Sequence, residues 1–244
     1  MNVNQVNSSD ADVILLGKLS IQAGTMNIGN SANNRHNDLE VGSAGIAEFE
    51  IAGSGVLNVN GEIRRSLVVQ SGSLKYTQSG TSTVLVRGKN PDGGGSLSLD
   101  RAKFEILNAG SEFNMSGSST LTIDRSGVVS GVFYDIYMDP SAYNITGGEI
   151  RVGTSTTAAS QNFISDIQVP LWNLSIDGTT TAKTVTLIGD PLVVQKNLRI
   201  EGNSIFVASG LDVTIGGDLV NQNTTSTTGL SNGGFRPVTA TQNT

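Results

Sequence analysis

IAEFEIAGSGVLNVNG, the stretch at residues 46–61, decides the fold of this chain. Phe49 and Ile51 alternate with polar residues, and so do Leu57 and Val59, with two glycines between the halves. Successive side chains of a β-strand point to opposite faces, so apolar residues at i and i+2 place one face against a core. Each half is therefore predicted to be a strand with one buried face, and the glycines are predicted to form a turn.

The same phrase returns along most of the chain. Four further copies are LSIQAGTMNI (19–28), LVVQSGSLKY (67–76), FEILNAGSEFNM (104–115) and LRIEGNSIFV (198–207). Strand phrases recur about every 10 to 12 residues, so two or three of them complete a coil of roughly 20 to 30 residues. The pattern predicts an all-β fold, a parallel β-helix (β-solenoid) with about eight to eleven irregular coils.

A β-sandwich is the alternative fold that could use the same strands. Hairpins favour compact two-residue turns between long alternating strands. Here the strands are short and the loops vary in length, for example NSANNRHND at 30–38 and KNPDGGG at 89–95. These features favour the solenoid.

The domain organisation follows from where the alternation begins and ends. We expect an N-terminal lead-in at residues 1–11, the β-helix at 12–220, and a polar linker or the start of a next unit at 221–244. An irregular coil is expected near 131–146, where Tyr134, Tyr137 and Tyr143 interrupt the rhythm. Aromatic side chains occur in cores and in binding surfaces, and core packing is favoured for these three.

The composition excludes several function classes. A net charge of −6 argues against a nucleic-acid partner, because phosphate neutralisation needs clustered Lys and Arg, and the basic pair is Arg64 with Arg65. The absence of cysteine removes disulfides and thiolate metal sites. Apolar runs are far shorter than the roughly 20 residues of a membrane helix, so no membrane span is expected. Residues 1–10 lack the pattern of a signal peptide, and we expect a fragment of a larger protein.

Two parts of the sequence resemble known families. The first part lies within residues 17–153 and resembles the strands of right-handed parallel β-helices in bacterial adhesins and autotransporter passenger regions. The stretches that carry this resemblance are GTMNIG, VGSAGIAEFEIAGSGVLNVNG and ITGGEIRVG. FISDIQVPLWNLSIDG at 163–178 and the ladder that follows it resemble units of large surface proteins from gliding bacteria that use type IX secretion. The residues that carry this second resemblance are Pro170, Leu171, Asn173, Leu174, Leu192, Val194, Leu198 and Ile200. The resemblance implies a right-handed β-helix in a secreted, cell-surface and usually non-enzymatic protein.

Candidate catalytic residues are sparse. The sole histidine, His36, sits in a polar loop without a second histidine or a cysteine, which favours a structural or solvated role over metal ligation or base catalysis. A β-helical polysaccharide lyase or hydrolase would need clustered carboxylates, or carboxylates with a nearby Arg or Lys. The acidic pairs are Asp135 with Asp139, Asp166 with Asp177, and Asp212 with Asp218. None forms a compact motif with basic residues, so solvated acids are the favoured interpretation.

Metal binding is not assigned to any residue. The stretch from Asp92 to Asp100 faintly resembles a calcium-binding β-roll repeat, but a roll repeats its motif in tandem and here one imperfect copy occurs, so a turn is favoured. Calcium binding at acidic loops is left open. We therefore assign no catalytic, cofactor-binding or metal residues, and no cofactor.

The leading functional hypothesis is a structural or adhesive segment, acting as a non-enzymatic stalk or adhesion module. Expected partners are surface polysaccharide or another cell-surface protein, bound by variable loops at 30–38, 89–95, 131–146 and 154–162, at an extracellular or cell-surface location. A carbohydrate-active β-helix enzyme and a phage fibre scaffold are the alternatives. The sequence does not decide the oligomeric state.

Overall fold

The structure is a computed structural model that describes residues 2–3, 12–29, 37–42, 45–66, 71–87, 104–125, 134–157, 161–223 and 233–237. These residues form strands and turns without a helix, and the strands pair in parallel into four sheets. His36, the loop at 89–95 and the stretch from Asp92 to Asp100 lie outside the described residues.

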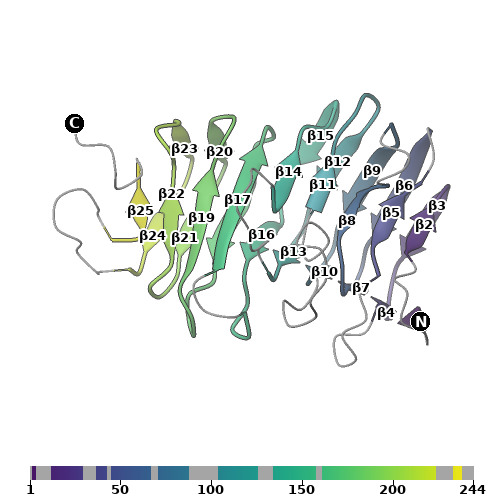
Figure 1. Ribbon diagram of the computed structural model, residues 1–244, viewed down its shortest axis with the longest axis horizontal. Coiled ribbons are helices and arrows are strands. Elements are labelled where there is room, and N and C mark those ends of the chain that lie inside the picture. Colours follow the sequence, from purple (N-terminus) through teal and green to yellow (C-terminus); the bar gives the residue numbers. More distant parts are fainter. Residues whose placement is uncertain are drawn as a thin grey trace.

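Two long sheets run the length of the molecule (Figure 1). Sheet A has nine strands in the order β1 (Asn2–Val3), β4 (Thr25–Ile28), β7 (Val56–Val59), β10 (Thr83–Val86), β13 (Thr120–Ile123), β16 (Glu149–Val152), β18 (Asn173–Ile176), β21 (Leu198–Ile200) and β24 (Leu219–Asn221). Sheet B also has nine, in the order β2 (Val13–Leu15), β5 (Leu39–Val41), β8 (Ile63–Arg65), β11 (Phe104–Ile106), β14 (Ile136–Met138), β17 (Gln161–Ile167), β19 (Lys183–Leu187), β22 (Ile205–Val207) and β25 (Phe235–Arg236).

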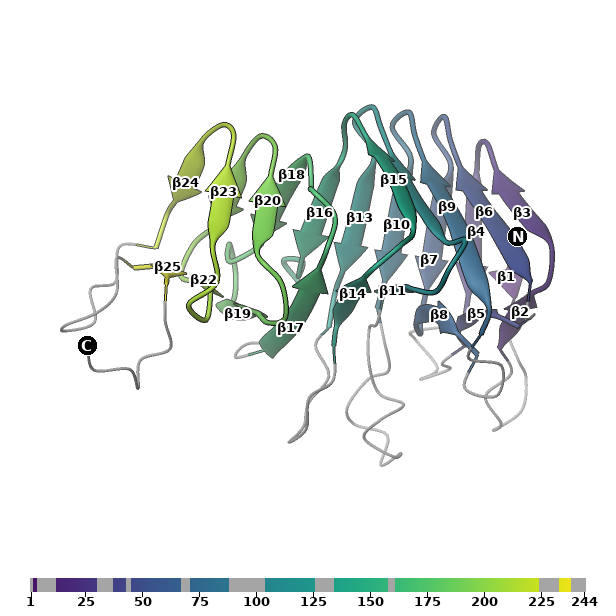
Figure 2. The ribbon, with the colours of Figure 1, turned by 90° about the horizontal axis from the view of Figure 1, so that it is seen from above.

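The third side of the molecule is divided. Sheet C contains β3 (Lys18–Ile21), β6 (Ile46–Ile51), β9 (Ser73–Gln78), β12 (Glu112–Met115) and β15 (Ala142–Ile145), and sheet D contains β20 (Leu192–Val194) and β23 (Val213–Ile215). Figure 2 shows the strands stacked in chain order along the long axis. The chain visits sheet B, then C or D, then A, before it returns to B one layer further on.

This path is that of a parallel β-helix, and the all-β solenoid expected from the sequence is confirmed. Parallel strands need a connection that crosses over, and in this chain the other two sheets provide it. The stretch at 46–61 forms β6 and β7, with the burial of β7 alternating as predicted. The handedness and the number of coils stay predictions. No helix in the described residues is long and apolar enough to cross a membrane.

The core holds a ladder of aromatic rings. Phe49, Tyr76 and Phe113 come from the neighbouring strands β6, β9 and β12, and Phe104 joins them from sheet B. Ring centroids lie 5.3 Å apart for Phe49 and Tyr76, and 5.4 Å apart for Tyr76 and Phe113. The Tyr76 hydroxyl donates a 2.7 Å hydrogen bond to Gln78 Oε1, so the one polar atom of the ladder has a partner.

Glycines stack at the corner between sheets C and A. Gly53, Gly80 and Gly117 occupy this corner in successive coils with φ of 57°, 72° and 71°, a left-handed backbone that glycine adopts without strain. A Cβ on Gly117 would lie 2.6 Å from the carbonyl oxygen of Gly80. Backbone therefore approaches backbone at this corner more closely than a side chain permits.

The described part of the irregular coil expected near 131–146, which begins at residue 134, is more regular than its sequence indicates. Within it, β14 and β15 pair in register with β11 and β12. The irregular coil is the next one. Between β17 and β18, where every residue is described, the chain forms no strand of sheet C or D, and a single bridge pairs Leu171 with Val194. Strand β25 at Phe235–Arg236 pairs with β22 and lies inside the stretch expected to be a polar linker or the start of a next unit.

The prediction that the three tyrosines pack in the core is wrong. Tyr134 and Tyr137 are half-buried and stack on each other with centroids 4.3 Å apart, and Tyr143 is 53% exposed. Tyr137 pairs with Glu105 on one side and Asp166 on the other, so it stands in a polar row on the outer face of sheet B. The strand neighbours of Tyr137, Ile136 and Met138, point inward instead.

Candidate functional site

Stacking of coils brings together polar residues that are distant in sequence. Along sheet A, Arg151 of β16 pairs with Ser175 of β18, which pairs with Arg199 of β21. Each step is 24 residues. Side chains in register on one face of a parallel sheet lie next to each other, so this part of sheet A gathers charges from three coils.

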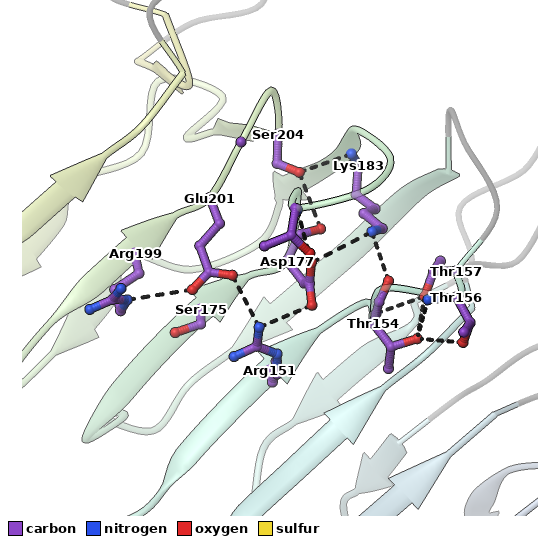
Figure 3. A network of polar contacts seen from close by, with 12 residues as sticks. Arg151, Thr154, Thr156, Thr157, Ser175, Asp177, Lys183, Arg199, Glu201 and Ser204 are labelled. Atoms are coloured by element: carbon purple, nitrogen blue, oxygen red, sulfur yellow. Dashed lines mark hydrogen bonds and ion pairs between the residues drawn. The ribbon is translucent and has the colours of Figure 1, made fainter.

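The result is a group that we call the Lys183 network, consisting of Arg151, Thr154, Asp177, Lys183 and Glu201 (Figure 3). Arg151 Nη2 donates to Asp177 Oδ2 and to Glu201 Oε2, both at 3.0 Å. Lys183 Nζ donates to the carbonyl oxygen of Thr154 at 2.9 Å and lies 4.0 Å from Asp177 Oδ1. Figure 3 shows the Arg151 guanidinium between the two carboxylates, and the ammonium of Lys183 between Thr154 and Asp177.

Lys183 is sealed inside this network. Its side chain is 0% exposed, and its backbone N–H donates to Ser204 Oγ at 3.0 Å. Gly153 makes room for the lysine, because a Cβ there would lie 2.9 Å from Lys183 Cε. Burial lowers the pKa of Lys183, and the nearby carboxylates of Asp177 and Asp124 oppose that shift.

Asp177 is held in its charged form. Burial acts to raise its pKa, but hydrogen bonds from Arg151 and Thr179 outweigh burial, and the pKa is lowered. A carboxylate, a guanidinium and a buried lysine with a lowered pKa are the groups from which a proton-transfer site is built. A base must reach the proton that it abstracts, however, and a lysine without exposed surface cannot contact a polymer outside the protein.

A second charged group lies between coils near β5 and β8, and we call it the Arg64 cluster. Carboxylate oxygens of Asp12, Asp38 and Glu40 all lie within 4.8 Å of one another, a spacing that suits a metal ion. Arg64 Nη2 lies 2.8 Å from Asp38 Oδ2 and 3.0 Å from Glu40 Oε1. The positive charge of the Arg64 guanidinium balances these carboxylates in place of a metal ion, so the Arg64 cluster is a structural ion-pair network.

Burial has an electrostatic cost in the Arg64 cluster. It raises the pKa of Asp38 from 3.8 to about 6, although Arg64 and a 2.7 Å hydrogen bond from the backbone N–H of Glu62 act in the opposite direction. The desolvation of the carboxylate therefore outweighs its ion pair.

A third group of charges lies on the outer face of sheet C. Lys18, Glu48, Glu50, Lys75 and Glu112 come from four neighbouring strands and line a shallow depression of about 140 Å³. Lys18 Nζ lies 2.7 Å from Glu50 Oε2, and Lys75 Nζ lies 2.8 Å from Glu112 Oε1. Their side chains are partly or largely exposed, so we call this surface the sheet C face and regard it as a contact surface.

The acidic pairs from the sequence have different fates in the structure. Asp135 accepts a 2.7 Å hydrogen bond from the Ile164 N–H, and Asp139 is exposed beyond the other end of β14. Asp166 lies on β17 of sheet B, whereas Asp177 follows β18 of sheet A, so these two acids do not form a pair. Asp212 and Asp218 are exposed at the starts of different strands.

The sequence pattern does not reveal the Lys183 network, because its members lie up to 50 residues apart, as Arg151 and Glu201 do. The signal that could have found it is the 24-residue spacing of Arg151, Ser175 and Arg199 in the printed sequence. Comparison with known proteins assigns no family: no family model, no curated protein and no solved structure matches this chain.

Proposed function

We propose that this chain is a non-enzymatic stalk or adhesion module, a segment of a bacterial cell-surface or secreted protein. The observation that carries the proposal is the burial of Lys183, because the described residues that most resemble an acid–base site surround a lysine with 0% exposure. Charges arranged in this way stabilise the stacking of coils and are poorly placed for turnover.

The shape supports a mechanical role. A core runs through the stacked coils from Leu15 to Ala208, and neighbouring coils are joined by strand pairing on two or three sides. Every layer of such a solenoid contacts only its neighbours, which gives a stiff body whose length grows with the number of coils. The resemblance of residues 163–200 to type IX-secreted surface proteins of gliding bacteria supports the cell-surface location and a right-handed coil.

Adhesion requires an accessible surface, and the sheet C face provides one. Its lysines and glutamates alternate across four coils, so it presents fixed charges of both signs to a polymer lying along the molecule. Surface polysaccharide or another cell-surface protein is the proposed partner class.

The test combines binding with turnover. The purified chain is incubated with intact bacterial cells and with insoluble polysaccharides, including uronic-acid polymers, and both the bound protein and newly released sugar ends are measured. We expect binding without product release. Lys75→Glu, which places a negative charge between Glu48 and Glu112, should weaken binding, whereas Lys196→Glu, at an exposed lysine beyond β20, should not.

Two results would overturn the proposal. Product release from a uronic-acid polymer that is lost in Asp177→Asn would show an enzyme. Failure of the chain to bind any cell or polysaccharide would refute the adhesive part of the proposal.

A further inference from the structure

Three acids from neighbouring coils lie near one another on the outer face of sheet B, and we call them the Asp166 cluster. Asp166 lies on β17, where its neighbour in register is Tyr137 of β14. Asp139 follows the end of β14, and Asp190 follows the end of β19, the strand on the other side of β17. The cluster therefore takes one acid from each of three successive coils.

Asp166 is the buried member of this cluster. The residue is 5% exposed, and its Oδ1 atom is buried without a hydrogen-bond partner. The backbone of Asp190 donates to the carboxylate. A Cβ on Gly189 would lie 2.5 Å from Asp166 Oδ2, and Gly189 has a φ of 81°. The turn after β19 is thus shaped around the carboxylate, with glycine at the point of closest approach.

Several other buried acids of this protein have a cationic partner, and Asp124 and Asp135 have hydrogen-bond donors. Arg64 neutralises Asp38 and Glu40, Arg65 Nε lies 2.5 Å from Glu105 Oε1, and Arg151 bridges Asp177 and Glu201. Within the parts of the chain that the structure describes, no ion pair joins Asp139, Asp166 or Asp190 to a Lys or Arg. Buried charges in proteins are paired or coordinate a metal, so Asp166 needs an explanation.

The electrostatics of the cluster point the same way. Burial raises the pKa of Asp166, and the like charges of Asp190 and Asp139 raise it further. The pKa of Tyr137 is raised by burial and by its neighbours Tyr134, Asp166 and Asp139, while Arg65 opposes that shift. Arg65 itself is engaged with Glu105. A bound cation would relieve the repulsion between these carboxylates.

We propose that the Asp166 cluster binds a calcium ion, with Asp166 as the central ligand and Asp139 and Asp190 closing on it from the flanking coils. Carboxylate oxygens are hard ligands that suit Ca²⁺, and its flexible coordination tolerates ligands from separate coils better than the strict octahedron of Mg²⁺. Among the described residues, only Asp12, Asp38 and Glu40 form a group of three acids in which one carboxylate oxygen from each already lies within 4.8 Å of the others. Binding at Asp166 therefore draws Asp139, which is exposed, and Asp190, which is half-exposed, inward.

The ion would join three successive coils along sheet B. A ligand that binds the folded chain alone stabilises it by mass action. This role concerns the stability of the rod, so its test is independent of whether the chain is adhesive.

The experiment is a calorimetric titration of the whole chain with CaCl₂, with MgCl₂ as the comparison, and with thermal unfolding measured in both salts. We expect one Ca²⁺ per chain with a Kd on the order of 10⁻⁴ to 10⁻³ M, as in extracellular calcium modules, and weaker Mg²⁺ binding. Saturating Ca²⁺ should raise the Tm by about 2 to 8 °C.

Variants locate the ion. Asp166→Asn retains the shape of the side chain and should weaken Ca²⁺ binding by about tenfold or more, with smaller losses for Asp139→Asn and Asp190→Asn. Asp38→Asn in the Arg64 cluster and Asp212→Asn at an exposed acid are matched controls that should leave the affinity unchanged. Circular dichroism verifies that each variant is folded.

The proposal is overturned by an absence of binding heat and of any Tm shift at millimolar Ca²⁺. It is equally overturned if folded Asp166→Asn binds Ca²⁺ as the wild type does, or if Asp38→Asn is the variant that loses binding, which would place the ion in the Arg64 cluster.

Discussion

Replacing Gly117 by alanine tests whether the coils are held at a spacing that only glycine permits at the corner between sheets C and A. Gly117 has a φ of 71°, and an added Cβ would lie 2.6 Å from the Gly80 carbonyl oxygen and 3.0 Å from its nitrogen. Both contacts are with backbone of the preceding coil, which cannot rotate away. The substitution therefore combines a backbone penalty with a steric one.

Gly24 separates the two penalties. It lies at the same corner of an earlier coil, between β3 and β4, with a φ of 77° and nothing within 4 Å of an added Cβ. The left-handed backbone costs an alanine about 1 to 2 kcal/mol at either position. Overpacking against the coil beneath adds about 1 to 3 kcal/mol at Gly117 alone. We therefore expect losses of about 1 to 2 kcal/mol for Gly24→Ala and about 2 to 5 kcal/mol for Gly117→Ala.

Urea unfolding followed by far-ultraviolet circular dichroism measures both free energies, with Trp172 fluorescence as a second probe of whether the transition is cooperative. Gly80→Ala should behave like Gly117→Ala, because its Cβ would meet the Gly53 carbonyl oxygen at 2.7 Å. Equal losses in the free energy of unfolding for Gly24→Ala and Gly117→Ala would refute the reasoning. Glycine would then be required at this corner for its positive φ and not for the close approach of the coils.

Three further predictions concern the core and the buried charges. Phe113→Ala should cost about 3 to 5 kcal/mol and Phe113→Leu less than about 1.5 kcal/mol, since leucine refills most of the ring's space between the coils; calorimetric Tm values compare them, and equal losses would contradict the packing argument. The pKa of Asp38, raised from 3.8 to about 6, gives stability that is complete below pH 4 and is lost as the pH rises through 6, about 3 kcal/mol in all. Asp38→Asn should remove this part of the pH dependence of unfolding between pH 4 and 7, and unchanged pH profiles would show that Asp38 is not the group. Lys183→Ala should destabilise by about 2 to 5 kcal/mol and Lys183→Met by less, because both remove the donor to the Thr154 carbonyl but methionine keeps the apolar stem in place. Chemical denaturation compares them, and equal losses would mean that the ammonium matters more than the packing.

The strands were predictable because their signal is local. In the stretch at 46–61, the alternation of Phe49 with Ile51 and of Leu57 with Val59 reports directly which side chains face the core, and all four are fully buried. The glycine at position 53 has the positive φ expected of a turn. One face of each strand must be buried wherever the coil goes, so these features depend little on the remainder of the chain.

The polar sites were not predictable, because they depend on which residues become neighbours in adjacent coils. The offset between paired strands of sheet A changes along the molecule: Thr83 pairs with Thr120, 37 residues later, whereas Leu198 pairs with Leu219, 21 residues later. Nearness along the chain was misleading for Asp166 and Asp177, which the coil assigns to different sheets.

By itself the sequence determined an all-β chain of short strands wound into a parallel solenoid, since alternation and glycine turns act over a few residues. Only the tertiary structure decided that Tyr137 stands outside the core, that Lys183 is enclosed with Asp177, and that Asp166 faces two other acids. The physical reason is that charges interact through space. Their partners are set by the register of one coil on the next, and loops of unequal length change that register from coil to coil.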